Sequence, residues 1–224
     1  MSYFKIAIDG PAGAGKSTIA RKIARSLSFV YVDTGAMYRA MALYFIRNHI
    51  RFDEKSKIES ACSNVDITIE FKDGEQIVIL NGEPVNAYLR TEEVGNMASA
   101  TSVNKAVRLK LVELQQNLAK KENVVMDGRD IGTYVLPDAQ LKIFLTASTE
   151  ERARRRWAEL KEKGLDADIT KIEDDIKERD HRDITREFAP LKQAPDAILL
   201  DSSESTIDEV VEMIMKYYHT IKED

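Results

Sequence analysis

The sequence predicts an α/β fold of three layers, with a central parallel sheet of five strands and helices on both faces. Short apolar runs alternate along the chain with segments whose apolar residues recur at helical spacing, which is typical of a parallel sheet. The first apolar run leads directly into a glycine-rich loop and then a helix. The 224 residues, 43% of them hydrophobic and 32% charged, suit one domain with smaller elaborations.

The five expected strands are short apolar runs, as strands buried on both faces usually are. They occupy residues 3–9, 29–32, 124–126, 141–145 and 197–200. Apolar stripes at helical spacing predict helices over residues 16–27 and 36–48, after Asn104, and from residue 207 onward. Thr91 and Asn104 are residue types that suit helix N-caps.

Residues 65–85 break this rhythm. Apolar and polar residues alternate over residues 67–71, and turn residues follow at 72–74 and 81–82. This pattern predicts a small antiparallel meander, inserted at the surface of the domain.

Residues 151–193, between the fourth and fifth expected strands, are polar and rich in charge, with little apolar periodicity beyond Leu160. They predict a solvated helical hairpin that moves. Arginines at helical spacing could stabilise a transferring phosphoryl group, although interleaved acidic residues also suit a solvated face of ion pairs. They form two groups, Arg152, Arg155 and Arg156 in the first and Arg179, Arg182 and Arg186 in the second.

A phosphate-binding loop is the strongest chemical signal. GPAGAGKST at residues 10–18 lies between an expected strand and an expected helix, which is the context that this motif requires. Its backbone N–H groups and the helix N-terminus favour phosphate. Lys16 is expected to reach the β- and γ-phosphates of ATP, and the Ser17 hydroxyl to bind Mg²⁺. A tight glycine turn without a ligand is the alternative, which the complete pattern disfavours.

Two carboxylates end expected strands near this loop. Asp127 follows an apolar strand, where a carboxylate can orient a Mg²⁺-bound water, and we rank it above Asp9 for that role. Asp9 alternatively caps a loop or helix.

Polar motifs follow two other strands at the same edge of the sheet. In DTGAMYR, Thr34 could donate its hydroxyl and Arg39 could bind an oxyanion, although Asp and Thr also begin helices as caps. In DGRD, Arg129 and Asp130 could read a phosphate and a donor group, or could form a loop ion pair.

Composition narrows the function class further. The net charge of −5 disfavours a broad nucleic-acid surface, so small anions are the expected partners. The single cysteine, Cys62, cannot form an internal disulfide, which fits a reducing compartment. No signal-peptide pattern begins the chain, and no apolar run approaches the roughly 18 residues of a membrane span. We therefore expect a cytoplasmic protein without membrane or nucleic-acid partners.

Taken together, these segments resemble the bacterial-type cytidylate kinases of the nucleoside monophosphate kinase family over nearly the whole chain. The resemblance rests on IDGPAGAGKST, DTGAMYRA, LRTEEV, DGRDIGT, PDAQLKIFLTAS, ERARRR and KERDHRDITR followed by APL. DTGAMYR and DGRDIGT in this order are more specific than the phosphate-binding loop. The resemblance implies transfer of the ATP γ-phosphoryl group to CMP or dCMP with Mg²⁺, by a monomer.

The resemblance also implies a P-loop NTPase fold divided within one kinase domain spanning residues 1–224. The core would comprise about residues 1–35, 91–150 and 190–224. The monophosphate-binding region, with its β insertion, would span about residues 36–90. The helical lid would span about residues 151–189.

Site residues follow from the resemblance position by position. The implied CMP-binding residues are Thr34, Arg39, Ser99, Arg108, Arg129, Asp130, Arg179, Asp183 and Arg186. The implied ATP-binding residues are Gly10, Pro11, Ala12, Gly13, Ala14, Gly15, Lys16, Ser17, Thr18 and Arg156. The implied catalytic residues are Lys16, Arg129, Arg155 and Arg179. Ser17, and Asp127 through a water, would hold the metal.

Other functions remain open on the residues alone. Another P-loop kinase acting on UMP, AMP, GMP, shikimate or dephospho-coenzyme A would share the donor loop. A nucleotide-dependent switch is a rival of another class, although the sequence lacks a guanine-recognition pattern such as NKxD.

Overall fold

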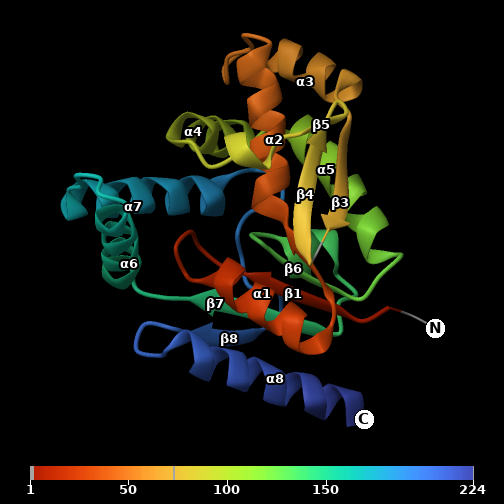
Figure 1. The fold of residues 1–224 in the computed structure, drawn as a ribbon, viewed down its shortest axis with the longest axis vertical. Helices are drawn as coiled ribbons and strands as arrows, with labels where there is room; N and C mark the ends of the chain where they lie inside the picture. The colour runs from red at the N-terminus through yellow and green to blue at the C-terminus, as the bar shows by residue number, and fades with distance from the viewer. Residues whose placement is uncertain (1–2, 73, 224) are drawn as a thin grey trace.

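The computed structural model describes residues 3–72 and 74–223. Five parallel strands form the central sheet in the order β2-β6-β1-β7-β8 (Figure 1). They are β1 (Lys5–Asp9), β2 (Val30–Asp33), β6 (Val124–Gly128), β7 (Leu141–Thr146) and β8 (Ile198–Asp201). The expected five-stranded parallel sheet is confirmed, with strand boundaries that shift by up to two residues.

Helices cover both faces of this sheet. Ile6 and Ile8 of β1 pack with α1 (Lys16–Leu27) and α8 (Ile207–Glu223) on one face. Ala7, between them, faces the cluster built by α2 (Thr34–Arg47) and α5 (Lys105–Ala119). Because neighbouring residues of a strand point to opposite faces, this alternation makes the sheet the middle of three layers.

The meander is confirmed as β3 (Ile67–Lys72), β4 (Glu75–Leu80) and β5 (Glu83–Pro84), an antiparallel sheet in the order β3-β4-β5. The expected turn at 72–74 includes Asp73, which lies outside the described residues.

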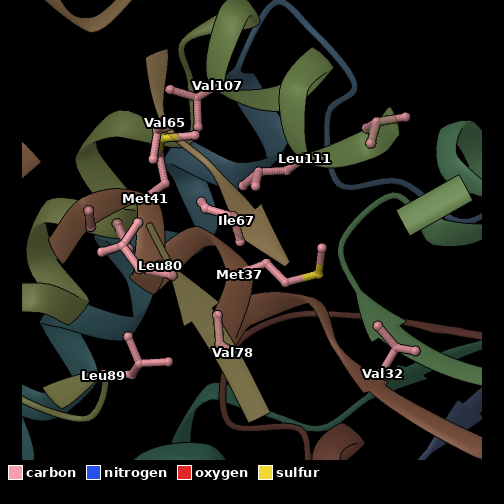
Figure 2. Packing of buried hydrophobic residues seen from close by; sticks show 14 of the residues in the cluster. Val32, Met37, Met41, Val65, Ile67, Val78, Leu80, Leu89, Val107 and Leu111 are labelled. Carbon is pink, nitrogen blue, oxygen red and sulfur yellow. The ribbon is translucent and has the colours of Figure 1, made fainter. Parts of the chain in front are cut away.

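The insertion lies at the surface as expected, since most residues of β3 are exposed, but its inner face is part of the main core. Val78 and Leu80 are buried in the same cluster as Met41 of α2 and Leu111 of α5 (Figure 2). Two further helices join this region, namely α3 (Lys55–Asn64), which the sequence patterns did not predict, and α4 (Glu92–Thr101). A 3-10 turn, η1 (Asn86–Tyr88), follows β5.

The charged segment is a helical hairpin of α6 (Thr149–Glu162) and α7 (Ile169–Thr185), which projects from one side of the molecule (Figure 1). The expectation of little apolar periodicity was wrong here. Ile172 and Ile176, four residues apart, bury their side chains against Ala153 and form a small core of their own.

Local signals at helix starts were reliable. Thr91 caps α4 by accepting a hydrogen bond from Val94 N at 3.3 Å, and Asn104 caps α5 by accepting from Ala106 N at 2.8 Å. Among the described residues, no helix combines the length and apolar character needed to cross a membrane.

Candidate functional site

The candidate site lies along the carboxyl ends of the parallel strands. β1 leads into the glycine-rich loop, β2 into Thr34 at the start of α2, and β6 into Arg129 and a short π-helix, η2 (Ile131–Val135). Because parallel strands end at a common edge, segments far apart in sequence meet here.

Glycine is required at two points of the loop. A side chain on Gly10, whose φ is 148°, would overlap the carbonyl oxygen of Leu145. Gly15 precedes α1 with a φ of 86°, in the left-handed region. The loop therefore passes close to the backbone of Leu145, and α1 begins directly at Lys16, where its first backbone N–H groups can donate to an anion.

Lys16 is buried within this loop, and its Nζ donates to the carbonyl oxygen of Pro11 at 2.6 Å. Burial lowers the pKa of its ammonium well below the ordinary value, and the charge of Arg129 lowers it further. Arg39 and Arg179 are similar, since burial lowers the pKa of Arg39 and brings that of Arg179 to about 10. The Nε of Arg179 is buried without a hydrogen-bond partner.

We call these three cations, Lys16, Arg39 and Arg179, the open cations. Within residues 3–72 and 74–223, none of them forms an ion pair with a carboxylate. A buried positive charge without a counter-ion is costly, so this arrangement is suited to an anionic ligand.

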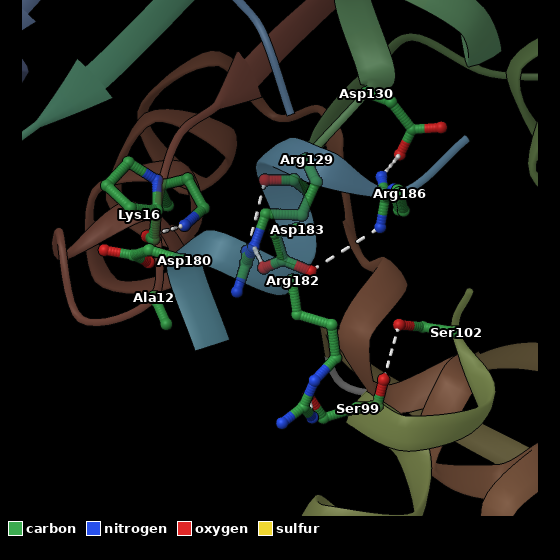
Figure 3. Close-up of polar contacts among 12 residues, drawn as sticks. Ala12, Lys16, Ser99, Ser102, Arg129, Asp130, Asp180, Arg182, Asp183 and Arg186 are labelled. Carbon is green, nitrogen blue, oxygen red and sulfur yellow. Dashed lines mark hydrogen bonds and ion pairs between the residues drawn. The ribbon is translucent and has the colours of Figure 1, made fainter. Parts of the chain in front are cut away.

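A second set of arginines is already neutralised by aspartates (Figure 3). Arg108 forms a buried ion pair with Asp130, and Arg186 Nη2 lies 3.4 Å from the same carboxylate. Arg129 Nε donates to Asp183 at 2.8 Å, and Arg186 Nη1 lies 3.6 Å from Asp183. We call Arg108, Arg129 and Arg186 the paired cations.

Asp127 has a different set of contacts. Its carboxylate accepts from Ser17 Oγ at 2.8 Å and from the hydroxyl of Tyr31 at 2.9 Å, and its backbone oxygen accepts from Thr34 Oγ1 at 2.6 Å. Burial raises the pKa of Asp127, and the charge of Asp33 adds to the rise. The oxygens of Ser17 and Asp127 fit Mg²⁺, which takes one or two protein oxygens and completes its shell with phosphate and water.

Asp9 holds a loop, as the alternative interpretation expected. Its two carboxylate oxygens accept from Ile131 N and Gly132 N, each at 2.7 Å. Burial raises the pKa of Asp9 to about 6, although these two bonds and Lys16 lower it. The segment after Asp130 is thereby fixed to the end of β1.

The structure decides two alternatives that the motifs left open. Asp33 caps α2 by accepting from Ala36 N at 2.9 Å, so the capped helix start is confirmed, with Thr34 placed directly after the cap. Arg129 and Asp130 do not pair with each other. They pair with Asp183 and Arg108 respectively, so the loop ion pair was wrong.

The three arginines of the first group in the hairpin, Arg152, Arg155 and Arg156, have different partners. Arg152 is buried against the phosphate-binding loop, where Nη1 donates to Ala12 O at 3.0 Å and pairs with Asp180 at 2.7 Å. This arginine therefore ties the base of the hairpin to the loop.

The other two arginines of the group point elsewhere. Arg155 Nη2 donates to Ser202 O at 2.6 Å, and Arg156 is exposed and bonded to Glu159 at 2.8 Å. Arg155 Nε also pairs with Glu151 at 2.8 Å, so the interpretation of these helices as a face of ion pairs holds for both Arg155 and Arg156.

The second group gathers at the site. Arg179 and Arg186 belong to the open and paired cations, and Arg182 Nη1 donates to Ser99 Oγ at 2.9 Å (Figure 3). The last contact joins α7 to α4, the helix that carries Ser99.

Sequence reasoning missed two residues of this region. The Tyr38 ring lies 5.4 Å from the Arg108 guanidinium, and burial raises the pKa of Tyr38 to about 12. The Gln76 side chain bonds to the backbone of Asp33. Gln76 has a sequence signal, because it occupies the inward register of β4, two residues before Val78.

A pocket of about 640 Å³ opens beside Ser17 and Arg39, between α1 and the insertion. Cationic side chains outnumber acidic ones in its lining, which includes Arg21, Lys22, Arg25, Arg39 and Arg90 together with Asp33 and Glu75. The local potential is therefore positive although the chain has a net charge of −5, and an anion is drawn to this side of the molecule.

Comparisons with known proteins agree on one family. The sequence model described as cytidylate kinase matches residues 6–220. The cytidylate kinase of Caldicellulosiruptor saccharolyticus is 52% identical over 221 residues, which cover 99% of this chain and 98% of that protein. The cytidylate kinase of Lactobacillus gasseri is 52% identical over 213 residues, covering 94% and 91%.

A solved structure of an uncharacterized protein from Eubacterium ventriosum is similar in fold. Its TM-score is 0.54 at 14% identity, and the match covers 96% of this chain and 97% of that one. This likeness concerns the fold alone.

Proposed function

The chain belongs to the cytidylate kinase family, and from that premise we propose that it transfers the γ-phosphoryl group of ATP to CMP, and also to dCMP. The observation that carries the proposal is the position of the open cations at the strand ends, beside a phosphate-binding loop on one side and the paired cations on the other. A donor phosphate and an acceptor phosphate would both supply the missing negative charge.

The donor side follows from the loop. The backbone of residues 10–18 and Lys16 would hold the ATP phosphates. Ser17, and Asp127 through a water, would hold Mg²⁺, which when bound neutralises charge on the phosphates. Arg156 is proposed to contact ATP, which requires it to leave Glu159, its partner in this structure.

The acceptor side uses the two sets of cations differently. Arg39 and Arg129 would bind the CMP phosphate, and Arg179 would bridge it to the ribose. Arg108 and Arg186, held by Asp130, would face the cytosine, with Thr34 and Ser99 nearby. Asp183 would accept from the ribose hydroxyls. These assignments combine the family resemblance with the contacts described above.

Catalysis then needs positioning and charge neutralisation rather than a general base, because the attacking CMP phosphate oxygen is already anionic at neutral pH. Lys16, Arg129, Arg155 and Arg179 are the proposed catalytic residues. Closure of the hairpin would bring its arginines over the phosphoryl group and exclude water. Arg155 would first have to leave the carbonyl oxygen of Ser202 and the carboxylate of Glu151.

The proposed division of the chain is into a core, a monophosphate-binding region at about residues 36–90 and a lid at about residues 151–189. We propose that the protein works as a cytoplasmic monomer, with ATP and CMP or dCMP as its partners and without nucleic acid.

An ADP-release assay with ATP and a panel of acceptors tests the function. CMP and dCMP should be strongly preferred over UMP, AMP and GMP. A flat profile, or a preference for another monophosphate, would reject the cytidylate assignment. Hydrolysis of ATP that ignores every acceptor would instead favour a nucleotide-dependent switch.

A further inference from the structure

The side-chain amide of Gln76 holds the backbone of Asp33 from outside the central sheet. β2 is at the edge of that sheet, so the outward N–H and C=O groups of its last residue need other partners. Gln76 Oε1 accepts from Asp33 N at 2.9 Å, and Gln76 Nε2 donates to Asp33 O at 3.1 Å. One amide therefore makes both bonds that a further strand would make.

Gln76 is itself fixed within the insertion. Its side chain is buried, and it lies in β4. Asn86 Nδ2 donates to Gln76 O at 2.7 Å, and Asn86 Oδ1 accepts from Val78 N at 2.8 Å. A continuous set of hydrogen bonds thus runs from η1 through β4 to the end of β2.

The backbone that Gln76 holds is the junction of β2 with α2. Asp33 caps α2, and the next residue, Thr34, bonds to the Asp127 backbone oxygen at 2.6 Å. Arg39 lies in the second turn of the same helix. A displacement of Asp33 would therefore move Thr34 and Arg39 together.

We propose that Gln76 is a positioning residue for the acceptor nucleotide, which couples the β insertion to the placement of Thr34 and Arg39. This role rests on the proposed function, because it takes CMP as the acceptor. A misplacement of binding groups by about 1 Å can reduce the rate of an enzyme roughly 100-fold, so a buried two-bond clamp at this junction is consequential. If Gln76 only supplied hydrogen-bond partners to the backbone at the edge of the sheet, its loss would change the stability of the protein and not KM for CMP.

The test compares Gln76→Ala with the wild type in KM for CMP and for ATP. We expect KM for CMP to rise about 10-fold and KM for ATP to change less than about two-fold, because within the described residues the hydrogen bonds of the Gln76 side chain go to Asp33 and none goes to residues 10–18. Val78→Ala is the matched control, since it removes buried volume from the same strand without touching Asp33. It should lower the melting temperature and leave KM for CMP near the wild-type value.

Amide hydrogen exchange provides a readout that is independent of activity. Exchange at Asp33 and Thr34 should become faster in Gln76→Ala and stay unchanged in Val78→Ala. Asn86→Ala removes the hydrogen bond from Asn86 to the Gln76 backbone and should loosen Gln76. It should also raise KM for CMP more than KM for ATP, by a smaller factor than Gln76→Ala does. This variant replaces Gln76→Ala in the test if Gln76→Ala does not fold.

Two results would overturn the proposal. One is a KM for CMP in Gln76→Ala within about two-fold of the wild type despite a lowered melting temperature. The other is unchanged exchange at Asp33. Failure of the proposed function would look different, because the wild type itself would then show no preference for CMP, while exchange at Asp33 would still report the clamp.

Discussion

The open cations and the paired cations occupy the same edge of the sheet but differ in charge compensation. Burial lowers the pKa of each open cation, and in the described parts of the chain none has a carboxylate partner. The paired cations are bonded to Asp130 and Asp183. Cationic side chains at one edge of the sheet thus differ in whether a carboxylate already compensates their charge, which suits them to different groups of a ligand.

Except at Arg129, which is paired with Asp183 and is also proposed to bind the CMP phosphate, the difference follows from the charge of what each set would bind. A phosphate brings its own negative charge, so a cation that waits for it is best left without a carboxylate. A base or a ribose is neutral, so donors directed at it need an internal counter-ion to be buried at acceptable cost. Arg129 apart, the comparison teaches that the ion-pair partners of an arginine help to separate phosphate-binding from base-reading arginines, which composition alone does not do.

The largest effect is expected at an open cation. Lys16→Met should reduce kcat about 1,000-fold, because it removes a charge that stabilises the transferring phosphoryl group. Its melting temperature should stay the same or rise, since burial disfavours the charged form of Lys16. Kinetics and thermal unfolding measure both. Lys57→Met, which changes an exposed lysine of α3 that is paired with Glu54, is the control and should retain wild-type activity. A loss below ten-fold in Lys16→Met would remove this lysine from the mechanism.

At a paired cation, the effect should appear in stability instead. Arg108→Met leaves the Asp130 carboxylate buried with a weaker partner, so the free energy of unfolding should fall by about 3 kcal/mol. Denaturant unfolding measures this change. Arg154→Ala, which breaks an exposed pair with Glu151, should cost less than about 1 kcal/mol. Equal effects of the two changes would contradict the distinction between buried and exposed pairs.

Arg39 tests the acceptor side of the open set. Arg39→Ala should reduce kcat/KM for CMP about 100-fold with little change in KM for ATP, because a charge-assisted contact to the acceptor phosphate is lost. Arg47→Ala, on the same helix but paired with Glu83 at the surface, provides the comparison. If the two variants had the same kinetics, Arg39 would not bind the acceptor.

The smallest effect concerns Asp9, which lies between the two sets and holds the loop after Asp130. Its pKa of about 6 lies above the ordinary value of 3.8, so between these values the folded protein binds a proton that the unfolded chain does not. Stability conferred by this proton should therefore increase as the pH falls through about 6. Relative to Asp9→Asn, the wild type should gain about 1 kcal/mol between pH 7 and pH 5. Parallel pH profiles of the two proteins would show that Asp9 does not titrate there.

Local patterns predicted the place of the phosphate-binding loop and the sheet well. The loop at residues 10–18 is contiguous and lies between β1 and α1 as its motif predicts, and each buried strand is a single apolar run. Helix caps at Thr91 and Asn104 are also local and were confirmed.

Long-range contacts were harder to predict. The pairing of Arg129 with Asp183 joins residues 54 positions apart, and adjacency in the sequence suggested Asp130 instead. The inner face of the meander and the core of the hairpin were missed because each is buried only by a second element. Arg152 looked like a mobile arginine, yet it binds the carbonyl oxygen of Ala12, a contact across 140 positions.

Calorimetric titration of CMP and of cytidine tests the central claim most directly. The open cations are expected to gain their missing negative charge from the CMP phosphate, so CMP should bind at least about 100-fold more tightly than cytidine. Arg39→Ala should narrow that ratio. Cytidine that binds as tightly as CMP would contradict the assignment of the open cations to the phosphate.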